Sequence, residues 1–268
     1  MSFVSGPFLL FFPIVTFVYF SVPQRLRWAW LLLASYFFYW SWNPWYVLLL
    51  FSVTAVTYLS GRFIGRADAL PDARKAEKRK KAAVAVSFVV CLGGLAAFKY
   101  LRFFSETASG ILSLFGIAAA PAEAFAPLPV GISFYTFQAL IYPVDVYPGD
   151  VRPERHFGKY ALYVSFFPQL VSGPIAESKD MLGQFDEEHF FNYGRARRGL
   201  LLMLWGYFEK MVVANRLAVP VDAVFSSPEK YGGVQVAAAA VFFALEIYCD
   251  FAGYSNIAIG AAQVLGFR

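Results

Sequence analysis

Three carboxylates lie inside strongly apolar stretches of the sequence: Asp145, Glu246 and Asp250. An ionised side chain in hydrocarbon costs at least about 2.5–3.5 kcal/mol, so such residues normally face a helix-bundle interior or water. Glu246 and Asp250 are four positions apart, and Tyr254 follows after four more, so one helix would carry all three on one face. This polar face is predicted either to line a substrate passage or to hydrogen-bond neighbouring helices, and the residues alone do not decide between the two.

The other reactive side chains indicate no familiar soluble-enzyme chemistry. His156 (R-P-E-R-H-F) and His189 (D-E-E-H-F-F) could serve as general bases, but both lie in charged loops, where a histidine is more often simply solvated. Cys91 and Cys249 occupy apolar runs and are interpreted as small core residues, not as a disulfide or as metal ligands. No metal site is predicted, and neither a G-x-S-x-G elbow, a phosphate-binding loop nor a hydrolase carboxylate pair is present.

The composition indicates the surroundings in which these groups act. The chain has 268 residues, of which 59% are hydrophobic and 15% charged, whereas soluble domains carry about 25% charged residues. A single soluble core of this size could not bury so much apolar surface. An all-α polytopic membrane protein is therefore predicted. The apolar runs expected to cross the membrane first are 7–22, 28–42, 45–61 and 82–98.

A basic loop separates the third of these runs from the fourth. Eight basic and three acidic residues lie between Arg62 and Lys81. Such a cluster would suit a nucleic-acid patch, but between two apolar runs it is typical of a cytoplasmic loop obeying the positive-inside rule. Arg25 and Arg27 agree with the same topology. We therefore expect residues 62–81 in the cytoplasm, the N-terminus outside, and no nucleic-acid partner.

The chain after residue 82 is less regular. The stretch 82–118 suits either one long tilted helix or a hairpin, so the topology beyond residue 98 stays open. The apolar run 160–172 is shorter than the roughly 20 residues that a spanning helix needs, and it ends at Gly173-Pro174. It is predicted to be a re-entrant or broken segment. Such backbone must be buried in protein or line a cavity, which we expect near 167–175.

Four sequence blocks carry a family resemblance. They are 128–147 (L-P-V-G-I-S-F-Y-T-F-Q-A-L-I-Y-P-V-D-V-Y), 160–175 (Y-A-L-Y-V-S-F-F-P-Q-L-V-S-G-P-I), 206–218 (G-Y-F-E-K-M-V-V-A-N-R-L-A) and 248–267 (Y-C-D-F-A-G-Y-S-N-I-A-I-G-A-A-Q-V-L-G-F). Together, and in this order, they resemble the membrane-bound O-acyltransferase family in its alginate O-acetylase branch. The resemblance extends over essentially the whole chain.

The resemblance implies a ring of tilted transmembrane helices with re-entrant elements, built as a single membrane-embedded domain over residues 1–268. It implies a bacterial inner-membrane enzyme with no bound cofactor, whose acyl donor is acetyl-CoA or another acyl thioester on the cytoplasmic side. The acyl group would pass to an extracytoplasmic polysaccharide such as alginate, often through a periplasmic acetyltransferase partner. Membrane lipid is the remaining expected partner. D-alanyl transfer to teichoic acid is a further possibility within the family.

The family's catalytic histidine lies in a W-x-x-W-H-like motif beyond the last block, and this chain stops at Arg268. Neither His156 nor His189 matches that motif. No catalytic residue is therefore assigned, and we expect a C-terminally incomplete domain that is inactive alone. The sequence departs from the family pattern at four positions, which leaves their roles open: Pro143, Glu209, Asn215 and Asn256.

Polarity within apolar runs, together with membership of the blocks, predicts a set of residues lining a substrate passage. The set is Gln138, Tyr142, Asp145, Gln169, Asp250 and Tyr254. Their expected roles are positioning and hydrogen bonding. Two other classes of protein remain: a non-catalytic membrane scaffold for a periplasmic acetyltransferase, and a transporter of a polar solute. The lack of a recognisable internal repeat weakens the transporter reading.

Overall fold

The structure is a computed structural model that describes residues 1–114, 129–171, 173 and 176–268. The described residues form helices, turns and loops and contain no strand. The chain divides into two compact units. The first unit comprises Met1–Phe38, Phe166–Pro174 and Asp186–Arg268, and the second comprises Tyr39–Ser165 and Ile175–Phe185. The predicted all-α fold is confirmed, whereas the predicted ring and the single domain stay predictions because the arrangement of the two units is not determined.

Three helices of the described chain are long and apolar enough to cross a membrane. They are α3 (Pro44–Ala67), the Ala73–Tyr100 part of α4 (Ala73–Leu114) and α10 (Gly233–Leu265). These helices make the chain a membrane protein. Two of the expected early spans form shorter helices, α1 (Gly6–Ser21) and α2 (Gln24–Trp40), of 16 and 17 residues. The orientation argued from the charges needs both to cross, and it stays a prediction.

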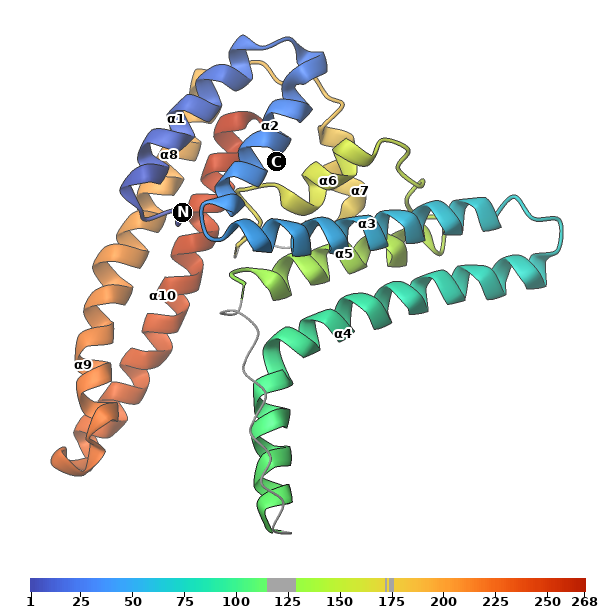
Figure 1. Cartoon of the computed structure of the whole chain (residues 1–268). Helices are drawn as coiled ribbons and strands as arrows, with labels where there is room; N and C mark the ends of the chain where they lie inside the picture. Colours follow the sequence, from blue (N-terminus) through green and yellow to red (C-terminus); the bar gives the residue numbers. More distant parts are fainter. Residues whose placement is uncertain (115–128, 172, 174–175) are drawn as a thin grey trace. The chain divides into compact units, whose positions relative to one another are not determined.

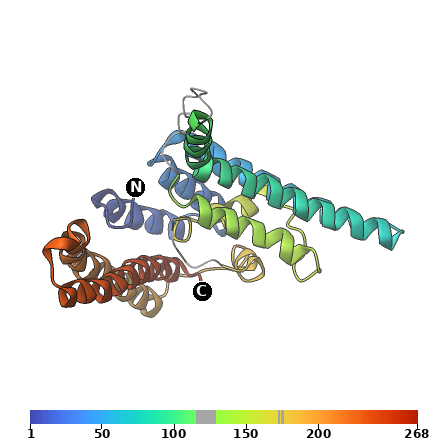
Figure 2. The ribbon, with the colours of Figure 1, turned by 90° about the horizontal axis from the view of Figure 1, so that it is seen from below.

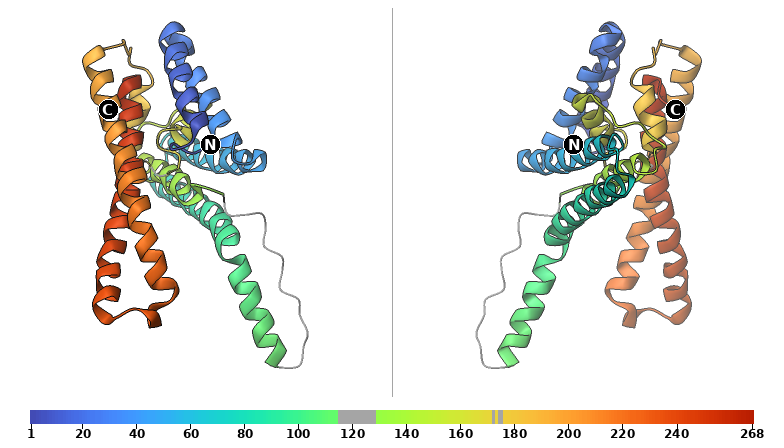
Figure 3. Two further views of the ribbon diagram at one scale, coloured as in Figure 1. Left: turned by 90° about the vertical axis from the view of Figure 1, so that its left-hand side faces the viewer. Right: turned by 90° about the vertical axis from the view of Figure 1, so that its right-hand side faces the viewer.

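The first unit contains a long antiparallel helix pair (Figure 3). One member runs through α8 (Tyr193–Tyr207), the π-helical η1 (Phe208–Ala214) and α9 (Asn215–Ser226) without interruption. After the short η2 (Pro228–Lys230), α10 returns along it. A π-helical turn holds one residue more than an α-helical turn and is often found at functional sites.

Glycines bring α8 and α10 into backbone contact at two levels. A Cβ built on Gly199 would lie 2.6 Å from the carbonyl oxygen of Gly260, and one on Gly206 would lie 2.5 Å from that of Gly253. The reciprocal positions are equally tight. Small residues at such crossings are typical of membrane helix pairs, because they let the backbones approach and pack without a hydrophobic driving force.

The predicted broken segment starts in a short helix and continues as turns. Helix α6 (Phe157–Ser165) has nine residues, and residues 167–171 form turns. The side chains of Phe166 and Phe167 are completely buried. Phe167 packs edge-on against Phe11 at 5.3 Å between ring centroids, and its backbone N–H donates to Ser35 Oγ at 3.1 Å. Aromatic side chains therefore fill the start of the predicted cavity, while residues 172, 174 and 175 lie outside the described part.

The second unit packs α5 (Ile132–Val146) and α4 against α3 (Figures 1 and 2). The smaller α6 and α7 (Ser178–Gln184) also contact α5. Of the two alternatives for 82–118, one long helix holds as far as Leu114, and residues 115–118 lie outside the described part. Figure 1 shows that this helix bends. Its Gly93-Gly94 pair is the type of sequence at which helices bend.

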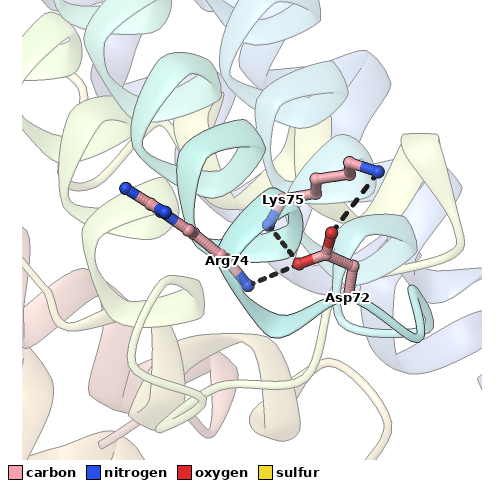
Figure 4. A network of polar contacts seen from close by, with 3 residues as sticks. All are labelled: Asp72, Arg74 and Lys75. Carbon is pink, nitrogen blue, oxygen red and sulfur yellow. Dashed lines mark hydrogen bonds and ion pairs between the residues drawn. The ribbon is translucent and has the colours of Figure 1, made fainter.

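The start of α4 is fixed by an aspartate in the basic loop (Figure 4). Asp72 Oδ1 accepts hydrogen bonds from the backbone N–H groups of Arg74 and Lys75 at 3.0 and 3.1 Å. The other carboxylate oxygen lies 3.4 Å from Lys75 Nζ. An aspartate here satisfies N–H groups that have no partner within the helix, so the loop between α3 and α4 is short and sharply defined.

Candidate functional site

Polar side chains gather where η1 of the first unit faces α10. The carboxylate of Glu209 accepts two hydrogen bonds, from Trp205 Nε1 at 2.9 Å and from Asn256 Nδ2 at 2.6 Å. Glu209 is 9% exposed, so this carboxylate is almost removed from the surface. Burying a carboxylate is tolerated only when its oxygens are hydrogen-bonded, and here both are.

An ion pair lies beside this carboxylate. Lys210 Nζ contacts Asp250 Oδ1 and lies 5.1 Å from the centroid of the Tyr254 ring. The lysine side chain is 18% exposed and the aspartate 46%. Opposite charges held together in this way lower the cost of keeping each in an apolar helix pair. The ring face of Tyr254 adds a weaker attraction for the ammonium group.

The close helix contact explains why these side chains meet. A Cβ built on Gly253 would lie 3.0 Å from Lys210 Cβ, so η1 and α10 approach with no side chain between them. Adjacent residues of the π-turn, Glu209 and Lys210, therefore both reach partners on α10. We call this set the η1–α10 cluster: Trp205, Glu209, Lys210, Asp250, Tyr254 and Asn256.

Glu246 lies one helical turn before Asp250, as the spacing predicted. Its Oε2 atom is buried and has no hydrogen-bond partner among the described residues. An unpaired polar atom in apolar surroundings is costly, so this carboxyl group differs from its neighbour Asp250. The predicted shared face thus contains one neutralised carboxylate and one carboxyl oxygen left unsatisfied.

Three residues of the predicted passage set lie in the second unit and make hydrogen bonds to other segments of that unit. Gln138 Nε2 donates to the carbonyl of Tyr163 at 2.8 Å, and the Tyr163 hydroxyl donates back to the carbonyl of Gln138 at 3.2 Å. Asp145 accepts a 2.6 Å hydrogen bond from Ser178 Oγ at the end of α5. These bonds join α5 to α6 and α7, which is the alternative role that the sequence left open.

A stack of tyrosines continues this packing. The rings of Tyr142 and Tyr160 lie 4.5 Å apart, and both side chains are completely buried. The Tyr160 hydroxyl donates to Thr57 Oγ1 at 2.7 Å, while the Tyr142 hydroxyl accepts from the backbone N–H of Glu154 at 2.8 Å. Tyr142 also lies directly against Gly61 of α3, where any side chain would collide with its ring.

The predicted passage set is therefore divided. In the first unit, Lys210 brings Asp250 and Tyr254 together. The second unit holds Gln138, Tyr142 and Asp145. Gln169 is half-buried and lies in the turns after α6. A common passage stays a prediction. The sequence analysis missed Lys210 and Trp205. A signal was present, because Glu209 and Asn256, two departures from the family pattern, turn out to be hydrogen-bonded to each other.

The histidines and cysteines require two corrections. His156 is exposed, and its Nδ1 accepts a hydrogen bond from the backbone N–H of Lys159 at 3.2 Å, at the start of α6. His189 is 6% exposed and packs on Phe267 at 4.7 Å between ring centroids, so its interpretation as a solvated loop residue is wrong. Cys91 is buried as predicted, whereas Cys249 is only half-buried. The described residues contain no group of three or more side chains able to hold a metal ion.

Comparison with known proteins identifies relatives over the whole chain. The probable alginate O-acetylases of Pseudomonas putida and Pseudomonas aeruginosa are each 33% identical to it over 100% of the chain, covering 54% and 50% of their own lengths. The peptidoglycan O-acetyltransferase of Helicobacter pylori is 30% identical over 86% of the chain and 46% of its own length. No protein-family profile matches. The chain spans about half the length of the curated relatives it matches. With these relatives and its all-helical membrane fold, the chain belongs to the membrane-bound O-acyltransferase family.

Proposed function

We propose that the protein is an O-acyltransferase that moves an acetyl group from a cytoplasmic acyl thioester, such as acetyl-CoA, toward an extracytoplasmic polysaccharide such as alginate. The observation that carries this proposal is the similarity to alginate O-acetylases along the complete chain. The peptidoglycan O-acetyltransferase relative supports the same type of acceptor, a polysaccharide outside the cytoplasm.

The η1–α10 cluster is the part of this chain that we assign to the reaction. Its charged groups lie between η1 and α10, a helix long and apolar enough to cross a membrane, where ionisable side chains usually mark the path of a substrate. Its role would be to orient and hydrogen-bond the acyl donor or acceptor. His156 and His189 are not assigned as the catalytic base, because the first is an exposed helix-start residue and the second packs on Phe267.

The proposal includes an orientation. Residues 62–81 would face the cytoplasm of a bacterial inner membrane and the N-terminus would lie outside, with the polysaccharide or a periplasmic acetyltransferase as partner on that side. The unequal distribution of arginine and lysine supports this orientation. Reporter fusions after Asn43 and after Asp72 test it independently of activity: we expect the first junction to report outside and the second to report inside.

Acetyl transfer by the complete protein tests the activity. In a strain lacking its own alginate O-acetylase, we expect the gene to restore acetyl esters on the polysaccharide, measured by proton NMR. Glu209→Gln and Asp250→Asn should reduce the acetyl content at equal protein level, whereas His156→Ala should not. Flux of a polar solute without acetyl transfer would favour a transporter. If the protein co-purifies with an acetyltransferase and only that partner carries the acetyl group, the result would favour a non-catalytic scaffold.

A further inference from the structure

An apolar groove follows the line along which α3 and α4 of the second unit meet. It has a volume of about 690 Å³. A hydrogen bond of 2.9 Å from Ser60 Oγ to the carbonyl of Ala83 joins the two helices along the groove. The apolar walls are well exposed and come from both helices: Leu59, Phe63, Val86 and Val90.

Two arginines line the same groove at the end nearest the loop between the helices. Arg66 belongs to the last turn of α3, and Arg79 lies in the second turn of α4. Val56 lines the groove ten residues before Arg66, which corresponds to about 15 Å along a helix. The groove is therefore apolar over most of its length and cationic at one end.

A second, polar pocket of about 770 Å³ shares Arg66 with this groove. Arg62, Arg152 and Arg155 also line it. Within the described part of the chain, no ion pair or side-chain hydrogen bond engages any of these four guanidinium groups.

The acidic residues of the polar pocket do not neutralise its arginines. Asp68 is paired with Lys80 at 2.8 Å. Glu154 Oε1 accepts the backbone N–H of His156 at 2.7 Å. Four guanidinium groups therefore surround a pocket that holds two carboxylates, one of them paired with Lys80, so positive charge remains in excess and favours an anion.

We propose that these two adjoining pockets form a binding site for one anionic phospholipid, whose phosphate contacts the arginines while an acyl chain lies along α3 and α4. A soluble anion would leave the apolar groove empty, and a neutral lipid would leave the arginine charges unbalanced. A phospholipid with net negative charge satisfies both halves, and basic residues beside membrane helices attract such lipids. This lipid is neither donor nor acceptor in the proposed acyl transfer.

Retention of phosphatidylglycerol by the complete purified protein tests the charged half. After delipidation and addition of phosphatidylglycerol or phosphatidylcholine, native mass spectrometry counts the bound lipids. We expect one tightly held phosphatidylglycerol per chain, and at least a fivefold loss of its retention in Arg66→Gln/Arg79→Gln. The control Arg74→Gln/Lys78→Gln removes two charges from the same basic stretch, residues 62–81, but from neither pocket, and should retain the lipid. Equal loss in both double variants would mean diffuse attraction by this stretch and would overturn the site.

A tryptophan scan tests the apolar half without changing charge. Val86→Trp places a large ring in the groove, whereas Val89→Trp places the same ring on an exposed position of α4 outside it. We expect only the first to reduce phosphatidylglycerol retention. If neither variant reduces it, the acyl chain does not occupy the groove and the proposal fails.

Soluble competitors separate a lipid from a free phosphate ligand. Glycerol 3-phosphate at millimolar concentration should not displace phosphatidylglycerol. If it does so as effectively as the lipid itself, the arginine pocket binds a soluble phosphate and the lipid assignment is wrong. Formation of chain dimers in place of lipid binding would likewise overturn it. None of these outcomes depends on acyl transfer, so the lipid site and the proposed function can fail separately.

Discussion

The α8–α10 contact of the first unit and the α3–α5–α6 packing of the second unit bury polar groups between helices in different ways. In the first, glycines let the backbones touch, and the polar groups include a buried carboxylate, Glu209, and the partly exposed ion pair of Lys210 and Asp250. In the second, tyrosine rings fill the space, and neutral hydroxyl and amide groups form closed hydrogen bonds. Polar groups between helices of this protein therefore differ in role. Satisfied neutral groups stabilise helix packing, whereas charges retained at a helix interface mark a candidate site.

The largest expected effect comes from breaking the ion pair. Asp250→Leu leaves the Lys210 ammonium without its partner, and an uncompensated charge between membrane helices costs about 2.5–3.5 kcal/mol. We expect a corresponding loss of stability in thermal unfolding in detergent. The double variant Lys210→Met/Asp250→Leu should recover most of it, because no lone charge remains. A double variant as unstable as the single one would show that the pair is not coupled.

The glycine contact is the next target. Gly206→Ala places a Cβ against the Gly253 carbonyl, and overpacking of this kind costs about 1–3 kcal/mol. Gly93→Ala in α4 is the matched control, since nothing lies within 4 Å of a Cβ built there. Alanine favours helix over glycine, so the control should unfold at the same or a higher temperature. Equal destabilisation by both changes would contradict the close approach of α8 and α10.

The tyrosine stack should respond more mildly. Tyr160→Phe removes the hydrogen bond to Thr57 but keeps the ring, which predicts a loss of about 1 kcal/mol. Tyr248→Phe changes a tyrosine that is 67% exposed and should leave stability unaltered. Acetyl transfer at equal protein level should remain normal in both variants. A selective loss of activity in Tyr160→Phe would indicate that the second unit takes part in acetyl transfer and not only in helix packing.

The smallest effect concerns pH. Tyr147 donates a hydrogen bond to Glu77, and this bond raises the pKa of Tyr147 above its ordinary value of about 10. The bond therefore contributes stability that is complete below the unfolded-state pKa and is lost as the pH rises through the folded-state pKa. The unfolding temperatures of the wild type and Tyr147→Phe should differ slightly at pH 8 and converge above pH 10. If the two unfolding temperatures differed by the same amount at every pH in this range, the hydrogen bond from Tyr147 to Glu77 would not be the cause of the difference.

Much of the fold follows from the sequence because apolar length and charge asymmetry act locally. The run 45–61 became α3, and the short run that begins at residue 160 became α6 followed by turns as far as residue 171. The single helix through Leu114 could not be chosen in advance, because Lys99 and Arg102 suit either alternative. The positions of charge were predictable, but their partners were not.

The candidate site was only half predictable for the same reason. Asp250 and Tyr254 share a helix face by spacing alone, so the sequence identified them. Lys210 joins them from another helix, and that contact depends on where Gly206 meets Gly253. Tyr142 and Gln138 are as polar in the sequence as Asp250 and Tyr254. Their hydrogen-bond partners in other segments of the chain could not be read from the sequence, and their place in a passage stays a prediction.

The π-helical turn also sets the rotational register of the helix that follows it. Gly199 and Gly206 are seven residues apart on the face of α8 that meets α10, and the same spacing would next bring Val213 and Pro220 to that face. The buried residues are instead Ala214 and Val221, one position later. One additional residue has been absorbed by η1, and one residue corresponds to about 100° of helix rotation. Deleting a single residue within 211–213 would therefore remove the extra residue and let a regular α-helix keep Ala214 and Val221 on the face that meets α10, in phase with the glycine contacts of α8.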